Sequence, residues 1–312
     1  MTISPAELRA TQEFFGFLST GPVEKDWHVI RAMQAISQVA AAPFRLVFAG
    51  GTCLARAHQL VRRMSEDVDF KIVRDGPAPA SANKLRQELG ALRDRVTAGL
   101  QATGFPIDPT DTKQLRSRDA NRYTVYQLAA GSTDPADGHL RPTLQIELSF
   151  AKLRLPPVSL AVSSFVSEAY GRPPDIPLID CASVTETAAE KIVSLTRRTA
   201  MELAGLSRAP DPTLVRHIYD VHAIREHINQ DAAVALAREI AVQDAQEFGN
   251  QHPAYRADIA AETHKALDFL KNEPAVRARY ADFVAAMVYG ERGDFTDAIA
   301  TLTRLVDQAW PA

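Results

Sequence analysis

Two pairs of residues in the segment 50–70, GGTCLARAHQLVRRMSEDVDF, could carry out phosphate chemistry together. Gly50 and Gly51 follow one apolar run, and Asp67 and Asp69 lie one residue apart inside another. Glycine weakens regular structure and aspartate is depleted from strands, so each pair is locally unfavourable. Because such residues concentrate at functional sites, this segment is the first candidate for one.

The two aspartates could bind a divalent cation. Residues i and i+2 of a strand point to the same face, so Asp67 and Asp69 are expected to be neighbours. Two close carboxylates repel each other, and a bound cation removes that penalty. Mg²⁺ takes one or two carboxylates together with water and phosphate oxygens, and two ions about 3.5–4 Å apart can hold both oxygens of a phosphoryl transfer. We expect Mg²⁺ here, with Mn²⁺ as the alternative.

Two ions call for a third carboxylate on a neighbouring strand. The segment LQIELSF (144–150) alternates, so that its leucines and isoleucine fall on one face and Gln145 and Glu147 on the other. Glu147 is therefore our third candidate ligand. Taken alone, Glu147 would equally be an ordinary exposed residue.

The glycines could bind the phosphates. A strand followed by Gly-Gly-Thr and a helix directs backbone N–H groups and a helix N-terminus at an anion. Without side chains, Gly50 and Gly51 let a triphosphate approach the backbone, Thr52 would cap the helix, and Ser65 would donate its hydroxyl. The alternatives are a simple Gly-Gly turn and a solvated Asp-x-Asp strand edge.

The elements that must position these residues form a strand–helix–strand unit. The apolar run RLVFA (45–49) predicts a buried strand, residues 52–62 a helix, and the alternating DVDFKIV (67–73) a half-buried strand. Upstream helices are predicted at 5–18 and 22–39, a further helix at 82–99, strands at 123–128, 144–150 and 158–165, and a turn-rich connection at 131–139. We therefore expect an α+β fold in which helices cover a mixed sheet.

An all-helical part is expected to follow. The capping box SVTE (183–186) predicts a helix to about residue 199, a second helix covers 211–227, and residues from 231 onward are helical with breaks at 249–253, 274 and 290–293. We place the boundary near residue 178, which gives domains 1–178 and 179–312.

The composition excludes several classes of protein. The 312 residues are 46% hydrophobic and 23% charged, and the net charge is -3. Residues 231–312 hold 13 acidic and 8 basic residues, net -5, which leaves +2 for residues 1–230, compatible with an anionic ligand there. Two cysteines define no disulfide framework. No signal peptide and no apolar run of about 20 residues is found, so we expect no membrane association and a reducing, cytoplasmic location.

With these residues in hand, the chain resembles the AbiEii/AbiGii toxin family of nucleotidyltransferases, within the polymerase-beta-like superfamily. The family pattern GGT-x-L followed by R-x-S-x-D-x-D matches residue by residue over 50–70. Three weaker segments agree in order: PVEKDWHVIRAMQAI (22–36), TAAEKIVSLTRR (187–198) and LVRHIYDVHAI (214–224). The resemblance implies a nucleotidyltransferase fold in which Asp67 and Asp69 bind Mg²⁺.

The resemblance also implies roles in the helical part. Lys191, like Ser65, would contact the nucleoside triphosphate, and Asp220 is similar to a further functional acid of the family. Here His217 stands where the family often has a second Asp, which leaves Asp220 alone. From the residues alone, Lys191 would be a solvated lysine, Asp220 an i,i+4 partner of Arg216, and His217 a surface or packing residue.

The function implied is Mg²⁺-dependent transfer of a nucleoside monophosphate from an NTP to an acceptor hydroxyl, with release of pyrophosphate. Some relatives modify the 3′ end of tRNA as toxins, so RNA, and tRNA first, is the leading acceptor and a cognate antitoxin the expected partner. The alternatives are a small-molecule or protein acceptor, or a catalytically silent module that binds nucleotide or antitoxin. The basic segment 112–123 either touches single-stranded nucleic acid or is a solvated loop.

Overall fold

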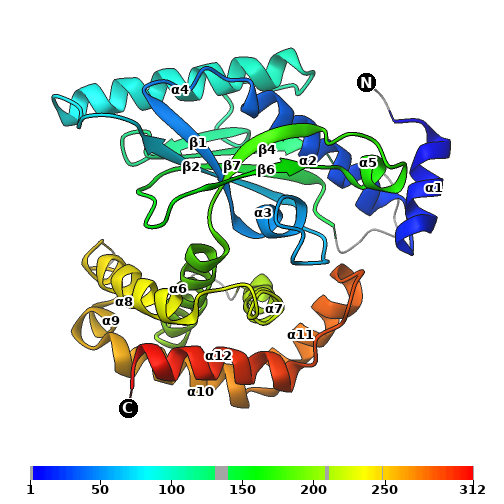
Figure 1. The fold of residues 1–312 in the computed structure, drawn as a ribbon. Helices are drawn as coiled ribbons and strands as arrows, with labels where there is room; N and C mark the ends of the chain where they lie inside the picture. The colour runs from blue at the N-terminus through cyan, green and yellow to red at the C-terminus, as the bar shows by residue number, and fades with distance from the viewer. Residues whose placement is uncertain (1–2, 131–139, 208–210, 248, 312) are drawn as a thin grey trace. The chain divides into compact units, whose positions relative to one another are not determined.

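The chain folds into two compact units. The computed structural model describes residues 3–130, 140–207, 211–247 and 249–311, so the expected turn-rich connection at 131–139 lies outside the described residues. The first unit comprises residues 1–59 and 63–182, and the second residues 60–62 and 183–312. All the strands belong to the first unit, whereas the described part of the second is helical (Figure 1). The predicted fold class, a mixed sheet with helices followed by an all-helical part, is confirmed.

A seven-stranded mixed sheet forms the first unit, in the order β3-β4-β5-β2-β1-β7-β6. The strands are β1 Phe44–Ala49, β2 Asp67–Arg74, β3 Leu115–Arg118, β4 Tyr123–Ala129, β5 Thr143–Phe150, β6 Val158–Val162 and β7 Ile176–Cys181. Strand β2 runs parallel to β5, and β1 runs parallel to β7, while the other neighbours are antiparallel. The central strands β1, β2, β4 and β5 agree with the sequence prediction.

Two strands, β3 at one edge of the sheet and β7 next to the other edge, were not predicted, and one predicted strand is shorter. Strand β3 has only four residues, LRSR, and β7 contains Pro177, a residue that argues against a strand unless it lies near an edge. The strand predicted over 158–165 ends at Val162. Ser164 then caps a new helix by accepting a hydrogen bond from the Ser167 N–H group, which stops the strand.

The helices of the first unit are α1 Pro5–Phe15, α2 Gly21–Ser37, α3 Gly50–Arg56, α4 Ala82–Ala102 and α5 Phe165–Ala169. Helix α3 corrects the expected cap. It begins at Gly50 rather than after Thr52 and ends at Arg56 rather than near residue 62. Gly50 has φ +74°, a left-handed value that glycine adopts without strain, and it turns the chain directly from β1 into the helix.

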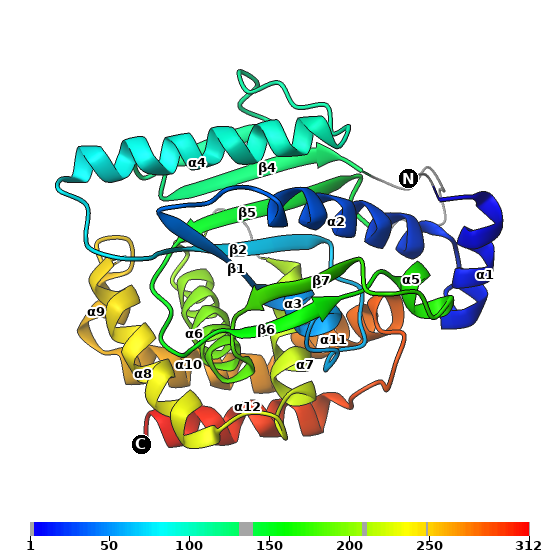
Figure 2. The ribbon, with the colours of Figure 1, turned by 45° about the horizontal axis from the view of Figure 1, so that its top comes forward.

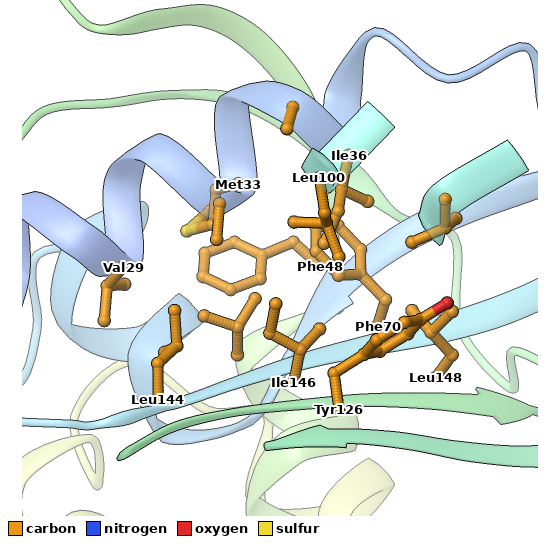
Figure 3. Packing of buried hydrophobic residues seen from close by; sticks show 14 of the residues in the cluster. Val29, Met33, Ile36, Phe48, Phe70, Leu100, Tyr126, Leu144, Ile146 and Leu148 are labelled. Carbon is orange, nitrogen blue, oxygen red and sulfur yellow. The ribbon is translucent and has the colours of Figure 1, made fainter. Parts of the chain in front are cut away.

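One apolar core lies between the sheet and the two long helices α2 and α4, which Figure 2 shows across the same face of the sheet. In Figure 3, Phe48, Phe70 and Ile146 from three adjacent strands point toward Met33 of α2 and Leu100 of α4. The rings of Phe48 and Phe70 have centroids 5.6 Å apart. Because alternate residues of β2 and β5 enter this core, the residues between them must face the other side of the sheet.

The second unit contains α6 Val184–Leu203, η2 Pro212–Leu214, α7 Val215–Ala223, α8 Gln230–Glu247, α9 Pro253–Ala257, α10 Ile259–Asn272, α11 Pro274–Met287 and α12 Phe295–Ala309. Ser183 caps α6 by accepting a hydrogen bond from the Glu186 N–H group, as the capping box predicted. The short stretch 60–62 joins this unit through the Arg62 carbonyl, which accepts a hydrogen bond from the Tyr289 N–H group. None of the helices in the described ranges is long and apolar enough to cross a membrane.

Candidate active site

The two aspartates lie on the same face of β2, opposite the core. Val68 and Phe70 are buried in the core cluster, so Asp67 and Asp69 point to the other side. The parallel register pairs Asp69 with Glu147 on β5. The structure therefore brings the three carboxylates expected from the sequence onto one face, which we call the carboxylate face.

Gly50 lies against the Asp69 carboxylate. The antiparallel register pairs Asp69 with Ala49, the last residue of β1. A Cβ atom at Gly50 would lie 2.0 Å from Oδ2 and 2.8 Å from Cγ of Asp69, far closer than real Cβ contacts. Two independent constraints therefore require glycine at residue 50. One is the left-handed backbone conformation, and the other is the Asp69 carboxylate, which occupies the position of a Cβ atom.

The rest of the glycine bend packs on the segment that leads into β2. A Cβ atom at Gly51 would lie 2.3 Å from Nη2 of Arg63, whose buried guanidinium also donates to the Met64 carbonyl at 2.8 Å. The Thr52 hydroxyl lies 2.8 Å from the Ser65 hydroxyl and bonds to the Asp67 carbonyl. Thr52 therefore ties α3 to the aspartate strand instead of capping the helix.

An arginine that the sequence pattern did not single out binds Asp67. Nη2 of Arg141, just before β5, forms an ion pair with Oδ1 of Asp67, and its Nε lies 3.5 Å from Glu66 Oε2. The Arg141 N–H group donates to Glu66 Oε1 at 2.7 Å, and its carbonyl accepts from the buried Lys25 at 2.6 Å. Burial lowers the pKa of Lys25, and the charge of Glu66 opposes that shift.

Glu147 is oriented by a chain of polar side chains. Its Oε1 accepts a hydrogen bond from Gln145, whose own carbonyl oxygen accepts one from Gln127. Burial raises the pKa of Tyr123, and the negative charge of Glu147 and a hydrogen bond to it raise that pKa further. Tyr123 therefore stays protonated and donates to Glu147, while Arg118 lies over its ring at 4.6 Å.

The side chains on the carboxylate face suit a single hard divalent cation whose coordination is completed by water and substrate. They do not form a complete metal site by themselves. Within the described ranges, no three His, Cys, Asp or Glu side chains are grouped so as to hold a metal. Mg²⁺ needs only one or two carboxylates when water and substrate phosphates supply the remaining oxygens, and the residues present that could supply two are Asp67 and Asp69.

The second unit buries a separate charged cluster. Nζ of Lys191 lies 2.7 Å from Oδ2 of Asp220 and 3.5 Å from Nδ1 of His217. Lys191 is 6% exposed and Asp220 is 0% exposed, so the interpretation of Lys191 as a solvated lysine is wrong. Burial lowers the pKa of His217 well below its usual value, and the charge of Lys191 adds to the shift. A neutral imidazole can accept a hydrogen bond from the ammonium group, so His217 is more than a packing residue.

Three basic residues near the aspartates escaped the sequence prediction. Lys71 is buried two residues beyond Asp69, and the alternation of β2 places it on the carboxylate face, a signal the sequence did contain. Arg63 lies within the matched motif but had no assigned role. Arg141 had no signal, because its position depends on the parallel pairing of β2 with β5, which brings together residues far apart in the sequence.

An aspartate pair on a central strand lies beside a glycine bend that opens a helix, which is the arrangement expected for a nucleotidyltransferase. A family model described as nucleotidyl transferase AbiEii toxin of type IV toxin–antitoxin systems matches residues 31–301. The chain belongs to this AbiEii family, and the resemblance seen in the sequence is confirmed. Membership makes it a nucleotidyltransferase toxin with an NTP as substrate and an antitoxin as partner.

Among solved structures, the chain is similar to MenT4, a nucleotidyltransferase toxin from Mycobacterium tuberculosis H37Rv. The two chains share 17% identity with a TM-score of 0.49, over 97% of this chain and 99% of MenT4. No curated protein sequence matches the chain.

Proposed function

We propose that this protein transfers a nucleoside monophosphate from an NTP to the 3′-terminal hydroxyl of an RNA, tRNA first, in a Mg²⁺-dependent reaction in the cytoplasm. The observation that carries the proposal is the contact between the glycine bend and the aspartate strand. A Cβ atom at Gly50 would overlap the Asp69 carboxylate, so this carboxylate lies directly against the start of α3, where the first backbone N–H groups have no partner within the helix. A metal bound to a triphosphate needs both kinds of group.

Each residue has a proposed task. Asp67 and Asp69 hold the metal, which supplies charge neutralisation at the triphosphate when it is bound. The phosphates are contacted by Gly50, Gly51, Thr52 and Ser65. We expect Mn²⁺ to be able to replace Mg²⁺.

The remaining roles concern the acceptor and the second unit. Glu147 adds a third carboxylate beside the metal and accepts the proton of the acceptor hydroxyl, since its hydrogen bonds to Gln145 and Tyr123 fix its direction. Lys191 is proposed to contact the nucleotide and Asp220 to hold Lys191 through their ion pair at 2.7 Å.

The reaction balances without a further reagent. The acceptor oxygen attacks the α-phosphorus, a new P–O bond forms, and the bond to the oxygen that bridges to the β-phosphate breaks. Pyrophosphate leaves, and the hydroxyl proton passes to Glu147. Positioning and charge stabilisation supply most of the catalysis in such reactions.

The test is a labelling assay. Each of the four α-³²P-labelled NTPs is incubated with the protein, total RNA and Mg²⁺, and the label is followed on RNA, protein and small molecules. We expect label at the 3′ end of tRNA, loss of labelling with EDTA, and recovery with Mg²⁺ or Mn²⁺. Label on a protein or a small molecule instead would replace the RNA acceptor by one of the two other acceptors.

Variants separate catalysis from binding. The double change Asp67→Asn and Asp69→Asn should abolish labelling and growth inhibition. Asp180→Asn is the matched control, because Asp180 is also a partly buried strand aspartate that binds an arginine, Arg45, at 3.3 Å. If growth inhibition survives the double change, the protein acts as a silent nucleotide- or antitoxin-binding module and the proposal is wrong.

A further inference from the structure

Arg141 supplies a positive charge to a carboxylate that the proposed function assigns to the metal. Its Nη2 binds Oδ1 of Asp67, and its Nε lies 3.5 Å from Glu66 Oε2. A guanidinium and a divalent cation on the same carboxylate repel each other, so the two compete for Asp67.

The backbone of Arg141 is held in place while its side chain is half exposed. Its N–H group donates to Glu66 at 2.7 Å, and its carbonyl accepts from Lys25 at 2.6 Å. Lys25 is itself held by the Thr143 carbonyl at 2.7 Å and by Glu66 at 3.5 Å, and its side chain is 0% exposed. The side chain of Arg141 is 41% exposed, so it can leave Asp67 without any change in the anchored backbone.

We propose that Arg141 is the internal counter-ion of Asp67 in the metal-free protein, and that its guanidinium moves to the triphosphate when the metal takes the carboxylate. This inference rests on the proposed function of the same site. A guanidinium suits both positions because its planar set of N–H donors binds carboxylate and phosphate oxygens alike. Arg141 is thus a nucleotide-binding residue whose resting position lowers the affinity of the site for metal alone.

The experiment measures metal and nucleotide binding separately on the intact protein. Free Mn²⁺ is titrated by EPR without nucleotide, and each NTP is then titrated with Mn²⁺ present and no acceptor. For Arg141→Gln we expect Mn²⁺ to bind about tenfold more tightly and the preferred NTP about tenfold more weakly, within the range typical of coupling between sites. A purely structural ion pair would not give opposite shifts. Arg141→Lys, which keeps the charge, should restore part of both.

A matched control and two further variants make the outcomes distinct. Arg172→Gln removes an arginine of similar exposure, 45%, whose Nη2 lies 2.6 Å from Glu7 Oε1, and it should change neither affinity. Adding Asp67→Asn to Arg141→Gln should cancel the gain in Mn²⁺ affinity. If Asp67→Asn and Asp69→Asn bind Mn²⁺ like the wild type, the proposed metal site is wrong. If those variants lose Mn²⁺ but Arg141→Gln binds as wild type does, the site stands and the role of Arg141 is refuted.

Discussion

Replacing Gly50 by alanine tests the geometry on which the site depends. Two costs arise. The residue has φ +74°, and a left-handed backbone costs a non-glycine residue about 1–2 kcal/mol. The added Cβ would also lie 2.0 Å from Oδ2 of Asp69, where contacts under 3.0 Å essentially never occur. The carboxylate or the β1–β2 pair must therefore shift by about 1 Å, and such overpacking costs about 1–3 kcal/mol. The total expected loss of stability is about 2–5 kcal/mol.

Gly16→Ala isolates the first cost. Gly16 has nearly the same conformation, φ +68°, and no atom lies within 4 Å of the position its Cβ would take. Urea unfolding should show a loss of about 1–2 kcal/mol for Gly16→Ala and a larger loss for Gly50→Ala. Because a 1 Å misplacement of a catalytic group can cost about 10²-fold, Gly50→Ala should lower kcat/KM by about that factor and weaken Mn²⁺ binding, whereas Gly16→Ala should do neither.

The result that would refute this reasoning is an equal loss of stability in the two variants together with unchanged Mn²⁺ affinity in Gly50→Ala. Asp69 would then not border the glycine bend in solution. The proposed contact between metal-bound triphosphate and backbone would lose its structural basis.

Two further predictions concern buried charges. Lys191→Met or Asp220→Asn alone leaves the partner charge buried and should lower the free energy of unfolding in urea by about 3–5 kcal/mol. The double variant should lose clearly less than the sum of the two single losses. Additive losses would show that the two groups do not interact. Burial raises the pKa of Asp26 to about 6, although Arg56 opposes the shift. This folded-state pKa lies above the unfolded value of 3.8, so the protonated form of Asp26 stabilises the fold. That contribution to the free energy of unfolding is complete below pH 4 and is lost as pH rises to about 6. The stability of the wild type relative to Asp26→Asn should fall by about 3 kcal/mol over that range, and a rise would show that the ion pair with Arg56 dominates.

The sequence by itself determined the central elements. The strands β1, β2 and β5, the helix start at Ser183 and the shared face of Asp67 and Asp69 all follow from alternation, capping residues and apolar periodicity. These are local properties, because a strand has a fixed period of two and a cap acts over three residues. The gapped motif over 50–70 likewise identifies the family, because it consists of residue types at fixed spacings along one short segment.

Only the tertiary structure decided which distant residues meet. Arg141 reaches Asp67 because β2 and β5 pair in parallel. The sequence of a strand does not specify which other strand it pairs with. Burial converted Lys191 from an apparently solvated lysine into the partner of Asp220, and it made His217 a neutral neighbour of that pair. The cost of placing a charge in a low dielectric depends on everything packed around it, so spacing along the chain cannot reveal it.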